Sequence, residues 1–217
     1  MIMYFEQSKL GVRKDLDYSI ARFHHQNKIL AFLQSNLPRV AKKLCGQSEF
    51  SIAQFNEDDI SREITNILND ELREKSGYIF RFEAKSGPDI IIFASPYVPF
   101  SPELFIIEAK RLPPTSSRDY VKSGIERFKK EEHGKKHSTA SMLGYVQDKD
   151  FEYWHHTINL WIDDLISQTS LNPRWENKDK LNRTRVEDLG EYKSTHSRIS
   201  ERPITLYHFW INLCTNN

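Results

Sequence analysis

The sequence contains very little cysteine. Cysteine occupies only two of the 217 positions, Cys45 and Cys214, near opposite ends of the chain. Neither belongs to a CxxC or cysteine–histidine cluster, so we expect neither a disulfide framework nor a structural zinc site. A chain of this length buries a core large enough to fold without them. This cysteine usage is typical of a reducing compartment, and we expect a cytoplasmic location.

Long apolar runs are also absent from the sequence. No stretch approaches the ~18 consecutive apolar residues that suggest a membrane-spanning helix. The first residues do not combine a basic segment with a long apolar one, so we expect no secretory signal peptide. The chain also lacks a GxxxxGK[ST] or GxGxxG segment, which argues against a nucleotide-binding enzyme. These absences predict a soluble protein that does not associate with a membrane.

Charge is balanced overall but distributed unevenly along the chain. The net charge is +1. The segment from Asn56 to Ile90 has nine acidic and five basic residues, whereas the segment from Arg118 to His137 has seven basic and four acidic ones. An acidic centre beside a basic segment suits a site that binds cations and handles a polyanion. Ordinary solvated faces would give the same distribution, so charge alone does not decide.

Residues 56–147 have the pattern of an α/β core. Asn56 and the acidic residues after it suit the start of a helix, whose apolar residues recur at helical spacing until Gly77. Three strands are predicted next, at 78–82, 90–94 and 104–110, and the last two are continuous apolar runs typical of buried strands. A helix over 118–132 and a strand over 141–146 complete this core.

Two extensions flank the core. Residues 1–55 predict a short strand or arm followed by a helix that includes Phe23, Leu30 and Phe32, with Pro38 interrupting or bending the chain after it. Residues 148–217 predict a helix over 151–167, a long polar loop that is a candidate mobile element, and two strands near 192–199 and 204–213. We expect one compact unit with a helical N-terminal and an α+β C-terminal extension.

Charged residues interrupt the apolar strands at only a few positions. Asp89 directly precedes one run, Glu108 lies within the next, and Lys110 follows two residues later, on the same face of the sheet. If the two strands pair, both carboxylates converge on one metal ion, and Mg²⁺ prefers such oxygen ligands. The ammonium can then orient the attacking water or stabilise the charge of a phosphoryl transition state. Burying these charges is costly unless they are paired or bind metal; the competing interpretation is that they point into solvent from an edge strand.

The segments GPDIII (87–92) and FIIEAK (105–110) resemble the two halves of the PD-(D/E)xK motif of restriction-endonuclease-like nucleases. The resemblance covers residues 56–147 and implies a central mixed sheet flanked by helices. It also implies that Asp89 and Glu108 bind Mg²⁺ or Mn²⁺ and that Lys110 is the catalytic lysine. The implied activity is that of an endonuclease hydrolysing DNA phosphodiester bonds, and bacterial defence nucleases are among the members.

Many members of this superfamily carry a further glutamate on the helix before the first strand. Glu57 is the first candidate, 32 residues before the motif aspartate and on the helix side that faces the sheet. Glu63 and Glu71 are alternatives, and any of the three could instead be a solvated helix acid. On the helix after the ExK strand, Arg127 and Lys130 are candidates for phosphate contacts or plain surface charges.

Two histidines lie in the predicted C-terminal strands. His196 stands in STHSR and His208 in LYHFW. This arrangement is similar to C-terminal segments of defence-linked nucleases. The pair could bind a phosphate or leaving group, help to fix an assembly, or be core residues satisfied beside aromatic rings.

The near-neutral charge bears on the partners that we expect. Phosphate contacts supply most non-specific DNA affinity, so a nuclease that binds DNA alone is often more basic. We therefore expect a homo-oligomer or partner proteins to supply DNA contacts or activation. An effector nuclease of a prokaryotic anti-phage or anti-plasmid system would fit, for example in a Lamassu-type defence complex with a DNA-sensing SMC-like ATPase. The alternative is a non-catalytic or partner-activated scaffold subunit of a nucleic-acid-processing complex. The intact motif residues argue against a degenerate copy.

Overall fold

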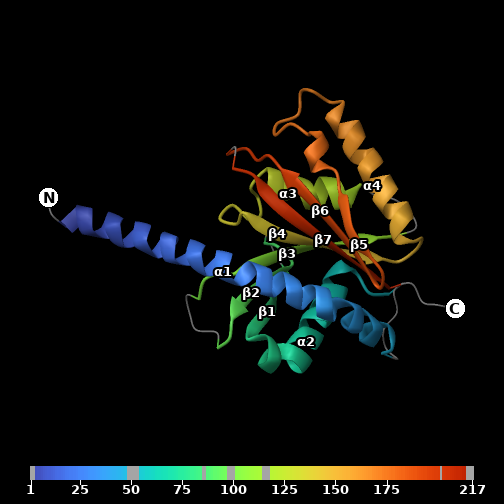
Figure 1. Cartoon of the computed structure of the whole chain (residues 1–217), viewed down its shortest axis with the longest axis horizontal. Helices are drawn as coiled ribbons and strands as arrows, with labels where there is room; N and C mark the ends of the chain where they lie inside the picture. Colours follow the sequence, from blue (N-terminus) through green and yellow to red (C-terminus); the bar gives the residue numbers. More distant parts are fainter. Residues whose placement is uncertain are drawn as a thin grey trace.

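The computed structural model shows an α/β protein built on one seven-stranded mixed sheet with helices on both faces (Figure 1). The structure describes residues 3–47, 54–84, 87–96, 101–113, 118–200 and 202–213, without the side chains of residues 3–22 and 71–75. Among the described residues, no helix is both long enough and apolar enough to span a bilayer.

The strands follow the order β1-β2-β3-β4-β7-β6-β5 across the sheet. They are β1 (Tyr78–Phe82), β2 (Ile90–Ala94), β3 (Phe105–Leu112), β4 (Thr139–Val146), β5 (Asn182–Val186), β6 (Leu189–His196) and β7 (Ile204–Asn212). The first three form an antiparallel meander, β3, β4 and β7 run parallel, and β6 and β5 return antiparallel. Parallel neighbours need crossover connections, and both crossovers of this sheet contain helices.

The sheet separates two apolar layers, and helices cover each of them. The helices α1 (Met3–Cys45) and α2 (Glu57–Ser76) pack on one face. The π-helix η1 (Tyr120–Ile125), the helices α3 (Glu126–Lys129) and α4 (Phe151–Ile166), and the 3-10 turn η2 (Asn177–Asp179) lie over the other. Side chains alternate along β3, so Ile107 packs in the first layer and Ile106 in the second.

The start of α2 is fixed by the helix cap that the sequence predicts. The side chain of Asn56 accepts a hydrogen bond from the backbone N–H of Asp59 at 2.9 Å, and the Asp59 carboxylate accepts one from the N–H of Asn56 at 3.1 Å. This reciprocal cap satisfies N–H groups that a helix start leaves without partners. At the other end Gly77 takes a φ of +68°, which a residue without a Cβ adopts readily. The cap therefore holds Glu57 in the first turn.

Most elements expected in the core are confirmed. The strands over 78–82 and 90–94 have the predicted bounds, and β3 and β4 are longer than predicted by one or two residues. The helix expected over 118–132 ends at Lys129 and begins as a π-helix. Its predicted apolar residues are all buried: Tyr120, Gly124, Ile125 and Phe128.

The helix expected around Phe23, Leu30 and Phe32 is confirmed as part of α1, whereas two other expectations about the extensions are wrong. The chain starts as helix α1 from Met3 rather than as a strand or arm, and Pro38 lies inside that helix. Phe23 is 72% exposed, because the N-terminal half of α1 projects away from the body of the protein (Figure 1). The polar segment after α4 is not a long loop, since it contains η2 and the exposed edge strand β5.

Candidate functional site

Asp89 and Glu108 lie side by side at the junction of β2 and β3. The antiparallel register pairs Ile90 with Ile107, and continuing it by one residue places Asp89 opposite Glu108. Directly opposed side chains have Cβ atoms about 5 Å apart. The Oδ2 atom of Asp89 accepts a hydrogen bond from the backbone N–H of Ala109 at 2.6 Å, which fixes its carboxylate against β3. The convergence expected from the two apolar runs is present.

Lys110 joins these carboxylates to Glu57 of α2. Its ammonium nitrogen lies 2.7 Å from Oε1 of Glu57 and 3.0 Å from Oε1 of Glu108, and it also donates to the carbonyl of Ala109 at 2.7 Å. The second oxygen of Glu57 accepts the backbone N–H of Arg111 at 2.9 Å. The capped start of α2 thus places Glu57 on the ExK strand, as its position in the sequence predicts.

Two residues that follow β3 in the chain, Arg127 and His133, also contact Glu108. Arg127 of α3 donates from Nη1 to Oε1 of Glu108 at 3.1 Å and lies 3.2 Å from Nε2 of His133. The same His133 nitrogen is 3.5 Å from Oε2 of Glu108. His133 is buried, whereas the Arg127 side chain is 41% exposed and therefore borders both the carboxylate and solvent.

The helix η1 packs closely against β3. A Cβ built on Gly124 would lie 2.5 Å from Cε of Met142 and 3.4 Å from Cγ of Lys110. Gly124 therefore lies against the flexible end of Met142 and in ordinary contact with the Lys110 side chain.

The protonation of the cluster is strongly perturbed by burial. Desolvation raises the pKa of Asp89 to about 6, and desolvation together with the charge of Asp89 raises the pKa of Glu108 to about 7. Burial alone would lower the pKa of Lys110, but Glu108, Glu57 and Asp89 outweigh it and the pKa is raised. Burial and the charge of Arg127 lower the pKa of His133 to about 4. At neutral pH the site therefore has a charged lysine, a neutral histidine and carboxylates that ionise reluctantly.

The donor atoms of the site fit a hard divalent cation. Asp89, Glu108 and Glu57 offer carboxylate oxygens, which Mg²⁺ and Mn²⁺ prefer. The Oε2 atom of Glu108 is buried and has no hydrogen-bond partner among the described residues. In that part of the chain no three His, Cys, Asp or Glu side chains are arranged to hold a metal together. The fit is thus to one or two carboxylates completed by water, which Mg²⁺ commonly accepts.

Other residues proposed from the sequence lie elsewhere. The contact described for Glu63 is to Asn66, at 3.4 Å, and Lys130 pairs with Glu126 one helical turn away at 3.0 Å. Both contacts are those of ordinary helix surface charges. The side chain of Glu71 lies outside the described residues.

His196 and His208 belong to a buried hydrogen-bond chain rather than to this site. Ser194 lies between them, 2.6 Å from Nε2 of His196 and 2.7 Å from Nε2 of His208. Nδ1 of His196 is 2.5 Å from Asp179, and Nδ1 of His208 is 2.9 Å from the hydroxyl of Tyr120. The Tyr120 hydroxyl also accepts from Trp210 at 2.8 Å, and Lys129 donates to Asp179 at 2.8 Å.

One proton arrangement satisfies this whole chain. If Trp210 donates to Tyr120, and each group then donates to the next as far as the Asp179 carboxylate, both histidines are neutral. Burial lowers the pKa of both histidines, which agrees with that assignment. The aspartate–histidine–serine sequence is also found in nucleophile triads, but Ser194 is only 2% exposed and is closed to a substrate. These hydrogen bonds therefore link η1, α3, β6 and β7 and form a structural network.

Sequence reasoning missed His133 and the placement of Arg127 on Glu108. His133 stands in a turn between α3 and β4, where Gly134 has a φ of +66°. The adjoining His-Gly pair was a signal for a histidine at a tight turn, but the carboxylate that it meets is 25 residues away in sequence. Only the folded crossover brings them together.

No protein-family model, curated protein or solved structure matches this chain. The interpretation of the site therefore depends on its own geometry.

Proposed function

We propose that this protein is a metal-dependent nuclease of the PD-(D/E)xK kind, which hydrolyses DNA phosphodiester bonds at Asp89, Glu108 and Lys110. The order helix, three-stranded meander, helix, parallel strand supports a restriction-endonuclease-like core formed by α2, β1–β3, η1, α3 and β4. The observation that carries the proposal is the buried carboxylate pair on neighbouring strands, with a lysine from the same strand beside it.

Asp89 and Glu108 would hold the Mg²⁺ or Mn²⁺ ion. When bound, such an ion neutralises phosphate charge and lowers the pKa of water, so that hydroxide becomes available as a nucleophile. Glu57 would act mainly by orienting Lys110, because one of its oxygens is bonded to the ammonium and the other to the β3 backbone.

Lys110 acts in this proposal as a charged donor and not as a base. Its raised pKa keeps the ammonium protonated at neutral pH. A fixed ammonium can orient the attacking water and stabilise the charge that develops on the phosphoryl oxygens. Arg127 borders the same carboxylate and solvent, which supports a phosphate contact by its guanidinium as part of this proposal.

The test is cleavage of plasmid and linear DNA with Mg²⁺ or Mn²⁺. Asp89→Asn, Glu108→Gln and Lys110→Met should each lose cutting by at least about 100-fold, the cost of removing one group that stabilises a transition state. Glu63→Gln is a matched control for the carboxylates, and Lys178→Met, an exposed lysine paired with Glu176, is a control for the lysine. Cutting that persists in the Glu108 or Lys110 variant would refute the proposal.

A specific alternative would hold if the folded wild type cut nothing. The chain would then be a partner-activated or scaffold subunit of a nucleic-acid-processing complex. The near-neutral charge of the chain favours this alternative over a nuclease that binds DNA alone. If the subunit is partner-activated, mixing it with its partner, for which a DNA-sensing ATPase of a defence complex is our candidate, or forcing oligomerisation should elicit cutting.

A further inference from the structure

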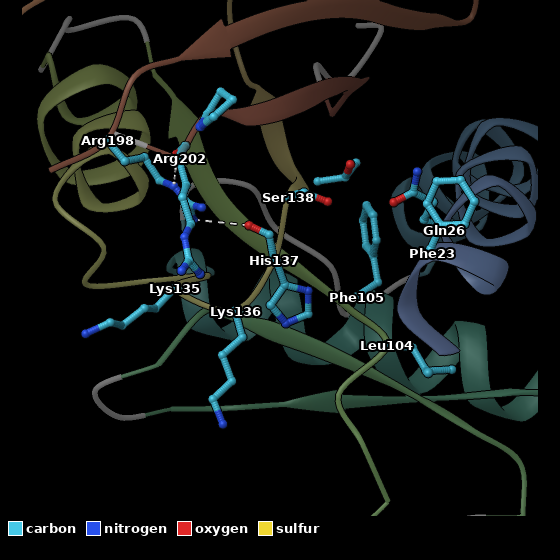
Figure 2. Close-up of a pocket in the computed structure, with 12 residues that line it drawn as sticks. Phe23, Gln26, Leu104, Phe105, Lys135, Lys136, His137, Ser138, Arg198 and Arg202 are labelled. Atoms are coloured by element: carbon cyan, nitrogen blue, oxygen red, sulfur yellow. Dashed lines mark hydrogen bonds between the residues drawn. The ribbon is translucent and has the colours of Figure 1, made fainter. Parts of the chain in front are cut away.

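Apart from the carboxylate site, the protein has a hollow of about 380 Å³ at the edge of the sheet where β3 and β4 begin (Figure 2). Lys135, Lys136 and Arg202 stand on one side of it. Phe23 and Gln26 of α1 stand on the other, and the ring of Phe105 lies between the two sides. No Asp or Glu occurs among the twelve described residues that line it.

The basic side chains of the hollow are exposed, and a buried arginine fixes the turn that carries two of them. Lys135, Lys136 and Arg202 are exposed to solvent. Arg198 beneath them is 5% exposed and donates to the carbonyls of Gly134 and His137 at 3.0 and 3.1 Å, which fixes the turn that carries the lysines. Among the described residues, two acidic side chains form ion pairs with the lining: Glu131, 3.7 Å from Arg198, and Glu103, 3.8 Å from His137. The lining itself carries four basic side chains (Lys135, Lys136, Arg198 and Arg202) in a chain of net charge +1.

The opposite side of the hollow offers an aromatic face. Phe23 is 72% exposed, unlike the apolar residues of α1 that face the sheet, such as Ile29 and Leu33. A base can stack on an exposed aromatic ring while its phosphate contacts lysine or arginine, and this combination is typical of proteins that bind single-stranded nucleic acid.

The hollow lies close to the carboxylate site along the chain. His133 contacts Glu108 at 3.5 Å, and Lys135 follows two residues later. Two residues span at most about 7 Å, so the backbone of Lys135 lies within that distance of the backbone of His133. Side chains alternate along β3, so Phe105 in the hollow faces α1 whereas Glu108 faces α3 on the other side of the sheet. A nucleic-acid strand cut at Glu108 would reach the hollow by passing round the edge of the sheet where β3 and β4 begin, beside Lys135 and Lys136.

We propose that this hollow binds the single-stranded segment of nucleic acid that continues from the bond to be cut. Lys135, Lys136 and Arg202 contact its phosphates, and Phe23 stacks on one of its bases. This inference rests on the proposed nuclease function for the identity of the strand, but binding at the hollow can be measured separately from cleavage.

The experiment measures fluorescence anisotropy of a labelled single-stranded DNA oligonucleotide with wild-type protein in EDTA, where no cleavage occurs. Lys135→Gln/Lys136→Gln should weaken binding by about tenfold and reduce the salt slope by about 1.4, as the loss of two phosphate contacts implies. Phe23→Ala should weaken it by about fivefold or more. All three side chains are exposed, so these variants should fold normally.

The matched control is Lys42→Gln/Lys43→Gln, which removes the same charge from an adjacent pair of exposed lysines. Lys42 lies beside Asn212, at the far end of β7 from the edge that carries the hollow. We expect this control to bind within about twofold of wild type.

The outcomes separate this inference from the proposed function. Equal binding by the hollow variants and the control, or no binding by wild type, would overturn the inference even if wild type cut DNA. Hollow-dependent binding would support it, and if the same protein showed no metal-dependent cutting, the nuclease proposal would fail while the binding surface stood.

Discussion

Glu108→Gln should stabilise the metal-free protein, although it removes a residue central to the site. The unfolded chain ionises Asp89 and Glu108 near their ordinary pKa values of 3.8 and 4.5, whereas the folded protein does so near 6 and 7. The folded state therefore keeps protons that the unfolded state has lost. The free energy of unfolding consequently falls as the pH rises from about 4 to about 7, and the full loss remains above that range.

The size of this effect can be derived from the pKa shift of Glu108. A shift from 4.5 to about 7 corresponds to about 3 kcal/mol at 1.36 kcal/mol per unit. The side chain is only 1% exposed, so solvent screening does not reduce this figure greatly. Glutamine resembles the protonated acid and keeps an acceptor for Lys110 and Arg127. For a protein of this size, about 3 kcal/mol raises Tm by about 6–12 °C.

The assay is thermal unfolding in EDTA between pH 5 and pH 8. Glu108→Gln should have a higher Tm than wild type at pH 8, and the difference should shrink towards pH 5. Glu63→Gln makes the same chemical change on α2 and should differ from wild type by less than about 2 °C. A Tm for Glu108→Gln several degrees below wild type at pH 8 would show that the ion pairs of Glu108 outweigh its desolvation, and the reasoning would be refuted.

Three further predictions concern neighbouring groups. Lys110→Met should abolish cutting but leave Mn²⁺ affinity within about tenfold of wild type, because the lysine does not supply a ligand; titration calorimetry checks this, and loss of binding would contradict it. Asp179→Asn leaves the buried ammonium of Lys129 without its carboxylate and should cost about 3–5 kcal/mol of unfolding free energy in urea with unchanged Mn²⁺ affinity. Burial opposes the shift, but the contacts with His196 and Lys129 outweigh it and lower the pKa of Asp179. The stability that these contacts give to the folded protein is therefore lost as the pH falls through that pKa. Gly124→Ala displaces only the flexible end of Met142, so the free energy of unfolding in urea should fall by no more than about 1 kcal/mol, and a loss of several kcal/mol would show that Met142 cannot shift.

The proximity of Asp89, Glu108 and Glu57 can be predicted from the sequence because local signals determine it. Asp89 and Glu108 end up opposed because two consecutive apolar strands pair as antiparallel neighbours. Glu57 reaches them because Asn56 caps α2 at the residue before it. Both features depend on segments that lie within about 50 residues of each other and have strong patterns.

Other parts of the fold could not be predicted because tertiary contacts decide them. Arg127 and His133 meet Glu108 only after the crossover brings α3 over β3, and no local pattern records that contact. The exposed strand β5 has the sequence NRTRV, whose polar residues suggest a loop, and it is ordered by pairing with β6. Pro38 is accommodated within α1 although a proline usually interrupts or kinks a helix.

The most direct test of the proposed metal site is Mn²⁺ binding measured by electron paramagnetic resonance at pH 8, without DNA. We predict that wild-type protein binds Mn²⁺, that Asp89→Asn and Glu108→Gln lose this binding, and that Glu63→Gln retains it. Binding that is absent from folded wild type, or that survives both substitutions unchanged, would contradict a metal site at Asp89 and Glu108.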